Sequence, residues 1–229
     1  EPGYTSFFTS AVASIQEQLL FFINIVSILI ISLSVTQEFR SGEIRMILLR
    51  GFSLKQLFKA KFLVILGTMG LFLSLYFCIS YAMGYYMLPK ISKVALFYHT
   101  GLFDYKYILI YTVQYYMIVF ASIIAFSSII FFICTFSQSV TMAISMSLIF
   151  LFGCLAFPTL MLFFRNWLCL EQIKHIQMIS LCEIQYEGIS IMLGEHKKYF
   201  AQNIFCVVLY IIIPFGSCLF SYSKKDQFY

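Results

Sequence analysis

Residues 107–134, YILIYTVQYYMIVFASIIAFSSIIFFIC, contain no Asp, Glu, Lys, Arg or His. Four further stretches share this property: 19–35, 62–88, 140–164 and 201–220. A helix needs about 20 apolar residues to cross the hydrocarbon core of a bilayer, with a range of about 17–25. Backbone amides in lipid must pair within the protein, and no strand-like alternation of polar and apolar residues occurs. The sequence therefore predicts membrane-spanning helices.

The composition indicates the same class of protein. Of 229 residues, 61% are hydrophobic and 11% are charged, whereas soluble domains average about a quarter charged residues. We expect an all-α, polytopic membrane helix bundle that forms a single transmembrane domain over 1–229. Its predicted spans are at about 19–36, 62–88, 107–134, 140–164 and 201–221. The net charge of +5 comes from bases in the membrane-flanking loops, so it does not indicate nucleic-acid binding.

Bases between the first two predicted spans set the expected orientation. They are Arg40, Arg45, Arg50, Lys55, Lys59 and Lys61. Loops rich in Lys and Arg face the cytoplasm, and alternating spans bring the basic C-terminal tail to the same side. We therefore expect a multi-pass plasma-membrane protein with a cytoplasmic C-terminus and an extracellular residue 1. The odd number of spans and the start at Glu1 also predict a missing N-terminal helix, hence six spans in the complete protein.

The stretch between the last two predicted spans, about 166–200, keeps apolar residues at helical spacing. This pattern predicts an outer helical segment that lies at or dips into the outer leaflet, and an ordinary folded loop fits it as well. Pro158 removes a backbone donor near the outer end of the fourth span and predicts a kink there. Cys169 and Cys182 share the outer segment, so a disulfide between them remains open.

Several kinds of chemistry are missing from the sequence. It has no GxxxxGK[ST] phosphate loop and no GxSxG motif, and its histidines lack metal-ligand spacing. We therefore predict that the chain is not an enzyme and binds no cofactor or metal. Ion-driven transporters usually place charged groups at membrane depth, but these spans offer only Asn24, Gln114, Gln202, Asn203, and serines and threonines. A sodium site made from backbone carbonyls is disfavoured as well. If the protein transports a substrate uphill, we therefore expect the energy to come from outside this chain.

The charged stretch QEFRSGEIRMILLRGFSLKQLFKAKF, residues 37–62, predicts a helix, a break and a second helix. Ile44, Ile47 and Leu48 form an apolar stripe at i, i+3 and i+4. Gly51 suits a left-handed helix end, and Ser53 with Gln56 matches a capping box. Anionic lipid could hold such a basic helix, and so could the docking cleft of a cytoplasmic protein. The residues alone leave both interpretations open.

The same stretch resembles the segment after the second span in ABC permeases of the type-two exporter superfamily, particularly the bacitracin- and lantibiotic-immunity branch. Their pattern runs E-[FY]-x-x-G-T-[IL]-[RE], then leucines, a break containing P-x-S or G-x-S, and a basic helix ending in lysine. The matching residues are Glu38, Phe39, Gly42, Ile44, Arg45, Leu48, Leu49, Ser53 and Lys61. Glu43 replaces the usual threonine, and Gly51 with Phe52 replaces the frequent proline context.

The resemblance implies a coupling helix at about 37–50 that docks on a separate ATPase subunit. Its docking residues would be Glu38, Phe39, Arg40, Gly42, Glu43, Ile44 and Arg45. The helix break and the connection into the second span would comprise Gly51, Ser53, Lys55, Lys59 and Lys61. Two ATPase copies carrying ATP and magnesium, and a second permease chain in a homo- or heterodimer, are the implied partners, within membrane lipid.

The function expected from this resemblance is ATP-driven export of a hydrophobic or peptide-like substrate, such as an antimicrobial peptide or a drug. No residue in the spans identifies that substrate. The alternative is a non-transport membrane protein, a sensor or an assembly factor, whose basic helix binds lipid or a signalling partner.

Overall fold

The computed structural model describes residues 6–7, 9–41, 53–89, 93–96, 98–137, 139–167, 169–194 and 199–225, and the statements below refer to these ranges. Within them, five helices are long and apolar enough to cross a membrane. The predicted helical bundle is therefore confirmed, and the chain is a membrane-embedded protein. The predicted coupling segment lies largely outside the described residues, at 42–52.

The first span is part of one longer helical rod. It consists of α1 (Ser10–Gln18), a π-helical turn η1 (Leu19–Ile23) and α2 (Asn24–Ser41). The rod thus begins before the predicted span at 19–36 and ends after it. A π-helical turn adds a residue to one turn of the helix, and such turns are frequent at functional sites.

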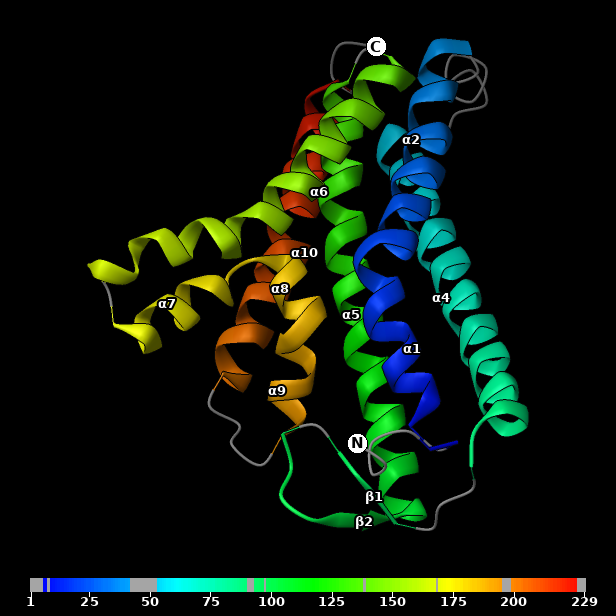
Figure 1. The fold of residues 1–229 in the computed structure, drawn as a ribbon. Helices are drawn as coiled ribbons and strands as arrows, with labels where there is room; N and C mark the ends of the chain where they lie inside the picture. The colour runs from blue at the N-terminus through cyan, green and yellow to red at the C-terminus, as the bar shows by residue number, and fades with distance from the viewer. Residues whose placement is uncertain are drawn as a thin grey trace.

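The other spans are α4 (Leu54–Met87), α5 (Tyr105–Phe136), α6 (Val140–Leu162) and α10 (Phe200–Lys225). A 3₁₀ turn, η2 (Phe163–Asn166), follows α6. Figure 1 shows that the end of α2, the beginning of α4 and the C-terminus lie at one end of the bundle, with the N-terminus at the other. The helices α2 and α4 therefore run in opposite directions, whereas α6 leaves the bundle sideways (Figure 1).

Helix α5 lies at the centre of the bundle (Figure 1). In the most apolar stretch of α5, 61% of the residues are buried. Only 17% are buried in the corresponding stretches of α4, α6 and α10. Tyr115, Phe126 and Phe131 of α5 are among the largest fully buried side chains. Apolar side chains on the outer spans can face lipid at no cost, because lipid tails are as apolar as leucine. The central position of α5 therefore arises from side-chain packing and not from hydrophobicity alone.

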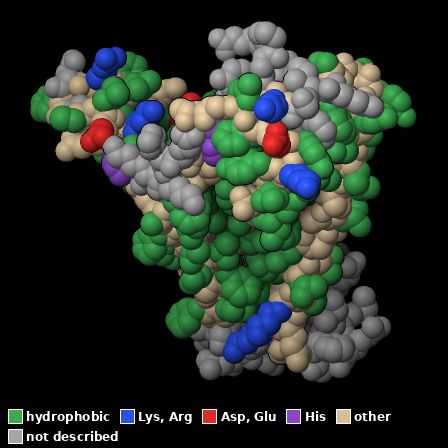
Figure 2. All heavy atoms as spheres, turned by 90° about the horizontal axis from the view of Figure 1, so that it is seen from below, with side chains coloured by type: hydrophobic (Ala, Val, Ile, Leu, Met, Phe, Trp, Pro, Cys, Tyr) green, Lys and Arg blue, Asp and Glu red, His purple; other side chains and the backbone are tan. Residues whose placement is uncertain are grey.

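A small β hairpin adds to the predicted all-α fold. Strands β1 (Lys93–Ala95) and β2 (Leu102–Asp104) pair antiparallel between α4 and α5. Tyr98 and Gly101 have positive φ angles of 62° and 116°, and they reverse the chain between the strands. Such short strands leave too little alternation in the sequence for a prediction. Figure 2 looks onto this end of the molecule, where hydrophobic side chains cover much of the described surface and several Lys, Arg, Asp and Glu side chains lie among them.

Among the described glycines, Gly84, near the hairpin end of α4, has the tightest surroundings. A Cβ atom at Gly84 would overlap the Ser10 hydroxyl and lie 2.8 Å from the Ser10 Cβ atom. By contrast, a Cβ atom at Gly67 would have no neighbour within 4 Å. Small residues let helix backbones approach in membranes. The glycine of α4 that packing requires is therefore Gly84.

We predict that Gly84→Ala destabilises the protein by about 1–3 kcal/mol, because overpacking forces α1 away from α4. The matched control is Gly67→Ala in the same helix, which should be neutral. Unfolding in mixed micelles of increasing denaturing detergent would measure both free energies. Equal stabilities for the two variants would contradict the close contact between α1 and α4.

Candidate functional site

The segment after α6 folds back among the spans as a series of short helices. They are α7 (Leu170–Gln177), α8 (Leu181–Glu183), the π-helical turn η3 (Ile184–Gly188) and α9 (Ile189–Leu193). From α8 to α9 they pack against α5, α6 and α10, beside which Figure 1 shows them. The segment is helical, and its second half is buried within the bundle. Its position on the outer side of the membrane stays a prediction.

Pro158 provides one attachment point for this segment. Because proline has no N–H, the carbonyl of Cys154 loses its partner within helix α6. The Ser180 hydroxyl donates a hydrogen bond to that carbonyl, at 2.8 Å. The Gln177 side-chain amide donates to the carbonyl of Pro158, also at 2.8 Å. These two hydrogen bonds around Pro158 thus attach the outer segment to α6. The helix kink expected at Pro158 stays a prediction.

A buried pair of amide side chains provides the second attachment point. Asn24, at the beginning of α2, donates from Nδ2 to Gln185 Oε1 in η3, at 2.8 Å. Gln185 Nε2 lies 3.5 Å from Asn24 Oδ1 in return. Both side chains have 0% exposure. The pair therefore joins the first span to the outer segment, and it lies beside the two π-helical turns.

Further polar groups from other helices converge on the same turn. Gln16 of α1 donates from Nε2 to the Tyr186 carbonyl, at 2.7 Å. A Cβ atom at Gly188 would lie 3.1 Å from Asn203 Nδ2 of α10, so glycine permits close packing there. Ser190 of α9 lies beside the Tyr115 side chain of α5. We call the residues Gln16, Asn24, Tyr115, Gln185, Tyr186, Gly188, Ser190 and Asn203 the η3 junction.

Asn203 Oδ1 of the η3 junction is buried without a hydrogen-bond partner among the described residues. A buried polar group that lacks a partner costs about 1–3 kcal/mol of stability, and such groups call for an explanation in a native structure. Ser127 and Ser147 have buried hydroxyls of the same kind, so this cost is not confined to the junction. The junction is where buried polar side chains of several helices meet, and it is our candidate functional site.

Acidic and thiol groups lie close to the junction in the outer segment. Burial raises the pKa of the Glu183 carboxyl; the charge of Glu187 raises it further, while Lys174 opposes the shift. A hydrogen bond with the Cys154 thiol, and burial, raise the pKa of Cys182. Cys169 is exposed and Cys182 is buried, and both are free thiols. The described structure thus lacks the disulfide that the sequence left open.

The predicted docking residues are only partly described. Glu38, Phe39 and Arg40 lie in the last turns of α2, and their side chains are not described. Gly42, Glu43, Ile44, Arg45 and Gly51 lie outside the described residues. Docking by this segment therefore remains a prediction.

The predicted helix start after the break is confirmed. The Ser53 hydroxyl accepts a hydrogen bond from the Gln56 backbone, at 3.3 Å, and the Gln56 side chain accepts one from the Ser53 backbone, at 3.1 Å. Lys55 and Lys59 are exposed on the first turns of α4. Lys61 donates from Nζ to the Ser34 carbonyl of α2, at 3.0 Å. The start of α4 is thus capped and hydrogen-bonded to the neighbouring span.

Aromatic packing holds the same part of α4 to two other spans. The Phe58 ring lies 4.8 Å from that of Phe131 on α5, edge to face, and 5.4 Å from that of Phe215 on α10. Phe62 contacts the same two rings, at 5.8 Å and 4.9 Å. Aromatic pairs of this geometry contribute about 0.5–1.5 kcal/mol beyond area burial. The start of α4 is therefore packed against both α5 and α10.

Sequence reasoning found only part of the η3 junction. Asn24 and Asn203 stood out as polar residues inside spans, but no partner could be assigned to them. Gln185 and Gly188 lie in the mixed segment 181–193, which also contains Glu183 and Glu187. Nothing local distinguishes Gln185 from the other polar residues of this segment. Among the described residues, no group of His, Cys, Asp and Glu is arranged to hold a metal ion.

Comparison with known proteins gives no relative for this chain. No family model matches it, and neither a curated protein nor a solved structure is detectably similar.

We predict that Asn24→Leu destabilises the protein by about 1–2 kcal/mol, because it leaves the Gln185 amide buried without its partner. Gln185→Leu should cost a similar amount, and the double variant less than the sum of the two. Gln114→Leu is the matched control, since Gln114 is exposed on α5. Detergent unfolding of the four variants would measure these differences, and strict additivity would contradict the pairing.

Proposed function

We propose that this protein is the membrane-spanning subunit of an ATP-driven exporter of the ABC type, which moves a hydrophobic or peptide-like substrate. The proposal rests first on the resemblance of residues 37–62 to the coupling segment of such permeases. The chain supplies no phosphate loop of its own, so a separate ATPase would supply the energy. Two ATPases and a second permease chain complete the proposed assembly, with the C-terminus in the cytoplasm.

The structural observation that best supports this proposal is the way α4 begins. A coupling segment must pass a displacement on to the spans, and this requires rigid attachment. The Ser53 cap opens α4 directly after 42–52, and α4 then continues unbroken to Met87. Phe58 and Phe62 attach its first turns to α5 and α10. A push on the segment before Ser53 would therefore reach three spans together.

The η3 junction supplies a second element of the proposed mechanism. The first rod runs from Ser10 to Ser41, so it joins the proposed coupling segment to the junction at Asn24. Motion of α2 would change the Asn24–Gln185 contact, and through it the position of the outer segment. We propose that this contact lets the ATPase side control opening on the outer side, where the substrate would leave.

The alternative function is that of a non-transport membrane protein that holds anionic lipid or a signalling protein. One observation favours it: Lys55 and Lys59 are exposed where α4 begins, and lysines at such a position attract anionic headgroups. Under this alternative, vesicle binding would depend on both lysines and no ATPase would copurify.

Charge reversal in the proposed docking segment tests the two functions. We predict that Glu38→Lys and Arg45→Glu each abolish copurification with the partner ATPase and lower substrate efflux at least tenfold, because misplaced charges oppose docking. Asp104→Lys, at the opposite end of the bundle, is the control and should retain both activities. Retention of ATPase binding and efflux by both docking variants would refute the proposal.

The proposed orientation has a direct chemical test. We predict that a membrane-impermeant maleimide labels Cys169 on intact cells, because this thiol is exposed in the segment assigned to the outside. Cys182 should stay unlabelled, since it is buried and its thiol has a raised pKa. Cys169→Ser is the control and should remove the label. Labelling of Cys169 only after cell lysis would show the opposite orientation.

A further inference from the structure

Two thiols from different elements meet where α8 docks on α6. Cys154 of α6 and Cys182 of α8 are both free thiols, and their side chains are hydrogen-bonded to each other. A second hydrogen bond fixes the same place: the Ser180 hydroxyl, two residues before Cys182, donates to the Cys154 carbonyl, at 2.8 Å. The way in which the outer segment attaches to α6 therefore also brings the two sulfurs together.

Pro158 is the local cause of this contact. It frees the Cys154 carbonyl from the helical ladder of α6, and Ser180 bonds to that carbonyl as the residue that precedes α8. Because α8 begins at Leu181, Cys182 lies in its first turn. Two sulfurs already in hydrogen-bond contact can form a bond after a side-chain rotation, without a new docking of α8.

The surroundings of the pair are apolar and set the order in which the thiols react. Cys182 is 2% exposed and belongs to the main hydrophobic core, whereas Cys154 is only partly buried against that core. The hydrogen bond that Cys182 donates to the Cys154 sulfur, together with burial, raises the pKa of the Cys182 thiol. Cys182 therefore keeps its proton, and Cys154 is the thiol that a reagent meets first. A reagent that enters such surroundings has to be small and uncharged, because burying a charge is costly.

Two other thiols lie near the outer segment. Cys169 directly precedes α7 and is exposed. Cys206 of α10 lies one turn before Tyr210, whose hydroxyl donates to the Ile179 carbonyl, at 2.8 Å. Cys169 and Cys206 are therefore the rival partners for Cys182.

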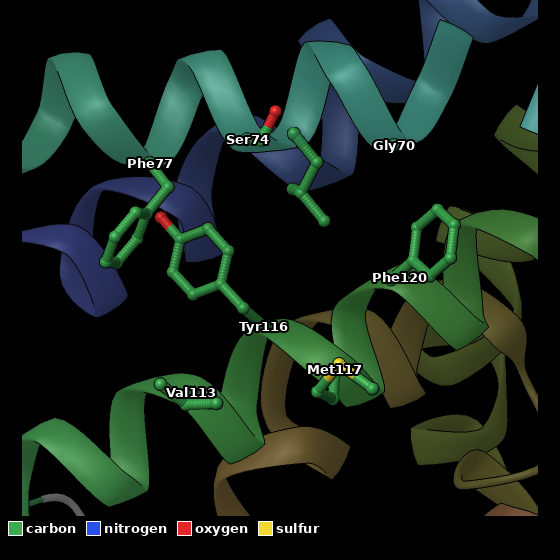
Figure 3. Close-up of a pocket in the computed structure, with 8 residues that line it drawn as sticks. Gly70, Ser74, Phe77, Val113, Tyr116, Met117 and Phe120 are labelled. Carbon is green, nitrogen blue, oxygen red and sulfur yellow. The ribbon is translucent and has the colours of Figure 1, made fainter. Parts of the chain in front are cut away.

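The groove between α4 and α5 offers no comparable chemistry. Figure 3 shows its lining, which among the described residues includes no cysteine, histidine, acid or base. Its hydroxyls are already used: Tyr116 donates to the Ala11 carbonyl, at 3.0 Å, and Ser74 to the Leu71 carbonyl, at 2.8 Å. Thiol chemistry thus belongs to the contact of α8 with α6 and not to this groove.

We propose that Cys154 and Cys182 form a reversible disulfide that fastens the outer segment to α6. The oxidant is a small, uncharged disulfide, RSSR. Cys154 loses its proton and attacks one sulfur of RSSR, so that a mixed disulfide forms and RS⁻ leaves. Cys182 then loses its proton and attacks the Cys154 sulfur, and the second RS⁻ leaves. The two protons convert both leaving groups to RSH, so two cysteine thiols are oxidised while one RSSR is reduced.

The disulfide acts on the η3 junction, because Cys182 lies two residues before η3 and three before Gln185. In the reduced protein, hydrogen bonds from Ser180 and Gln177 hold this part of the segment on α6. Hydrogen bonds break during local opening, whereas a covalent bond does not. Oxidation therefore keeps the junction closed. This effect does not depend on the proposed transport function.

Oxidation by an uncharged disulfide tests the proposal. The full chain in detergent micelles is treated with 2,2′-dipyridyl disulfide, the remaining thiols are blocked with N-ethylmaleimide, and the unreduced peptides are mapped by mass spectrometry. We expect a link between Cys154 and Cys182 that is well above any link of Cys182 with Cys169 or Cys206, and that dithiothreitol reverses. A mixed disulfide on Cys154 without this link, or equal links to the rival thiols, would overturn the proposal.

Matched variants and a second measurement complete the test. Cys182→Ser should remove the link, with Cys182→Ala in its place if the serine does not fold, whereas Cys206→Ser should retain it. Oxidation should slow amide hydrogen exchange in 184–193 by about tenfold in the unmodified chain, but not in Cys182→Ser and not within α4. Equal exchange in 184–193 before and after oxidation would contradict the fastening of the outer segment.

Discussion

Peptide groups inside a bilayer have no water to pair with, so each must find a partner within the protein. Regular helices meet this requirement along most of the chain, and the exceptions determine where the outer segment attaches. Pro158 leaves the Cys154 carbonyl without its helical partner, and Ser180 supplies the replacement. The Tyr186 carbonyl, in the π-helical turn η3, accepts from Gln16. These two carbonyls are thus satisfied by side chains from other elements, which helps to order 170–193 against the spans.

The first rod contacts two different parts of the molecule. Asn24, in its middle, pairs with Gln185, while the Ser34 carbonyl accepts from Lys61 near the start of α4. These contacts differ in cost, because the Lys61 side chain is only partly buried, whereas the two amides are fully buried. A buried amide pair is a poor source of stability, because apolar residues of the same shape would serve as well. Its value would lie in a contact that can break and reform, as the proposed export mechanism requires.

The parts of the fold that sequence predicted correctly are those with local causes. Five charge-free stretches became five long apolar helices, and Ser53 with Gln56 became a capping box, because both depend on residues close together in the chain. The β hairpin was missed because its strands are too short to show a period. Nothing in the neighbouring residues distinguishes Gly84 from Gly67, and only the position of Ser10 shows that Gly84 is closely packed. Gln185 gave no local signal, since its partner is far away in the sequence.

Sequence by itself therefore determined that this chain is a membrane protein, where its long apolar helices lie within the described residues and where α4 begins. Tertiary structure decided that α5 is central, that the outer segment enters the bundle and that Asn24 meets Gln185. The physical reason lies in the solvent. Hydrocarbon demands apolar side chains on every span, so hydrophobicity marks the spans but cannot tell an outer helix from an inner one. That distinction depends on shape and on a few polar contacts, which form only when distant segments pack together.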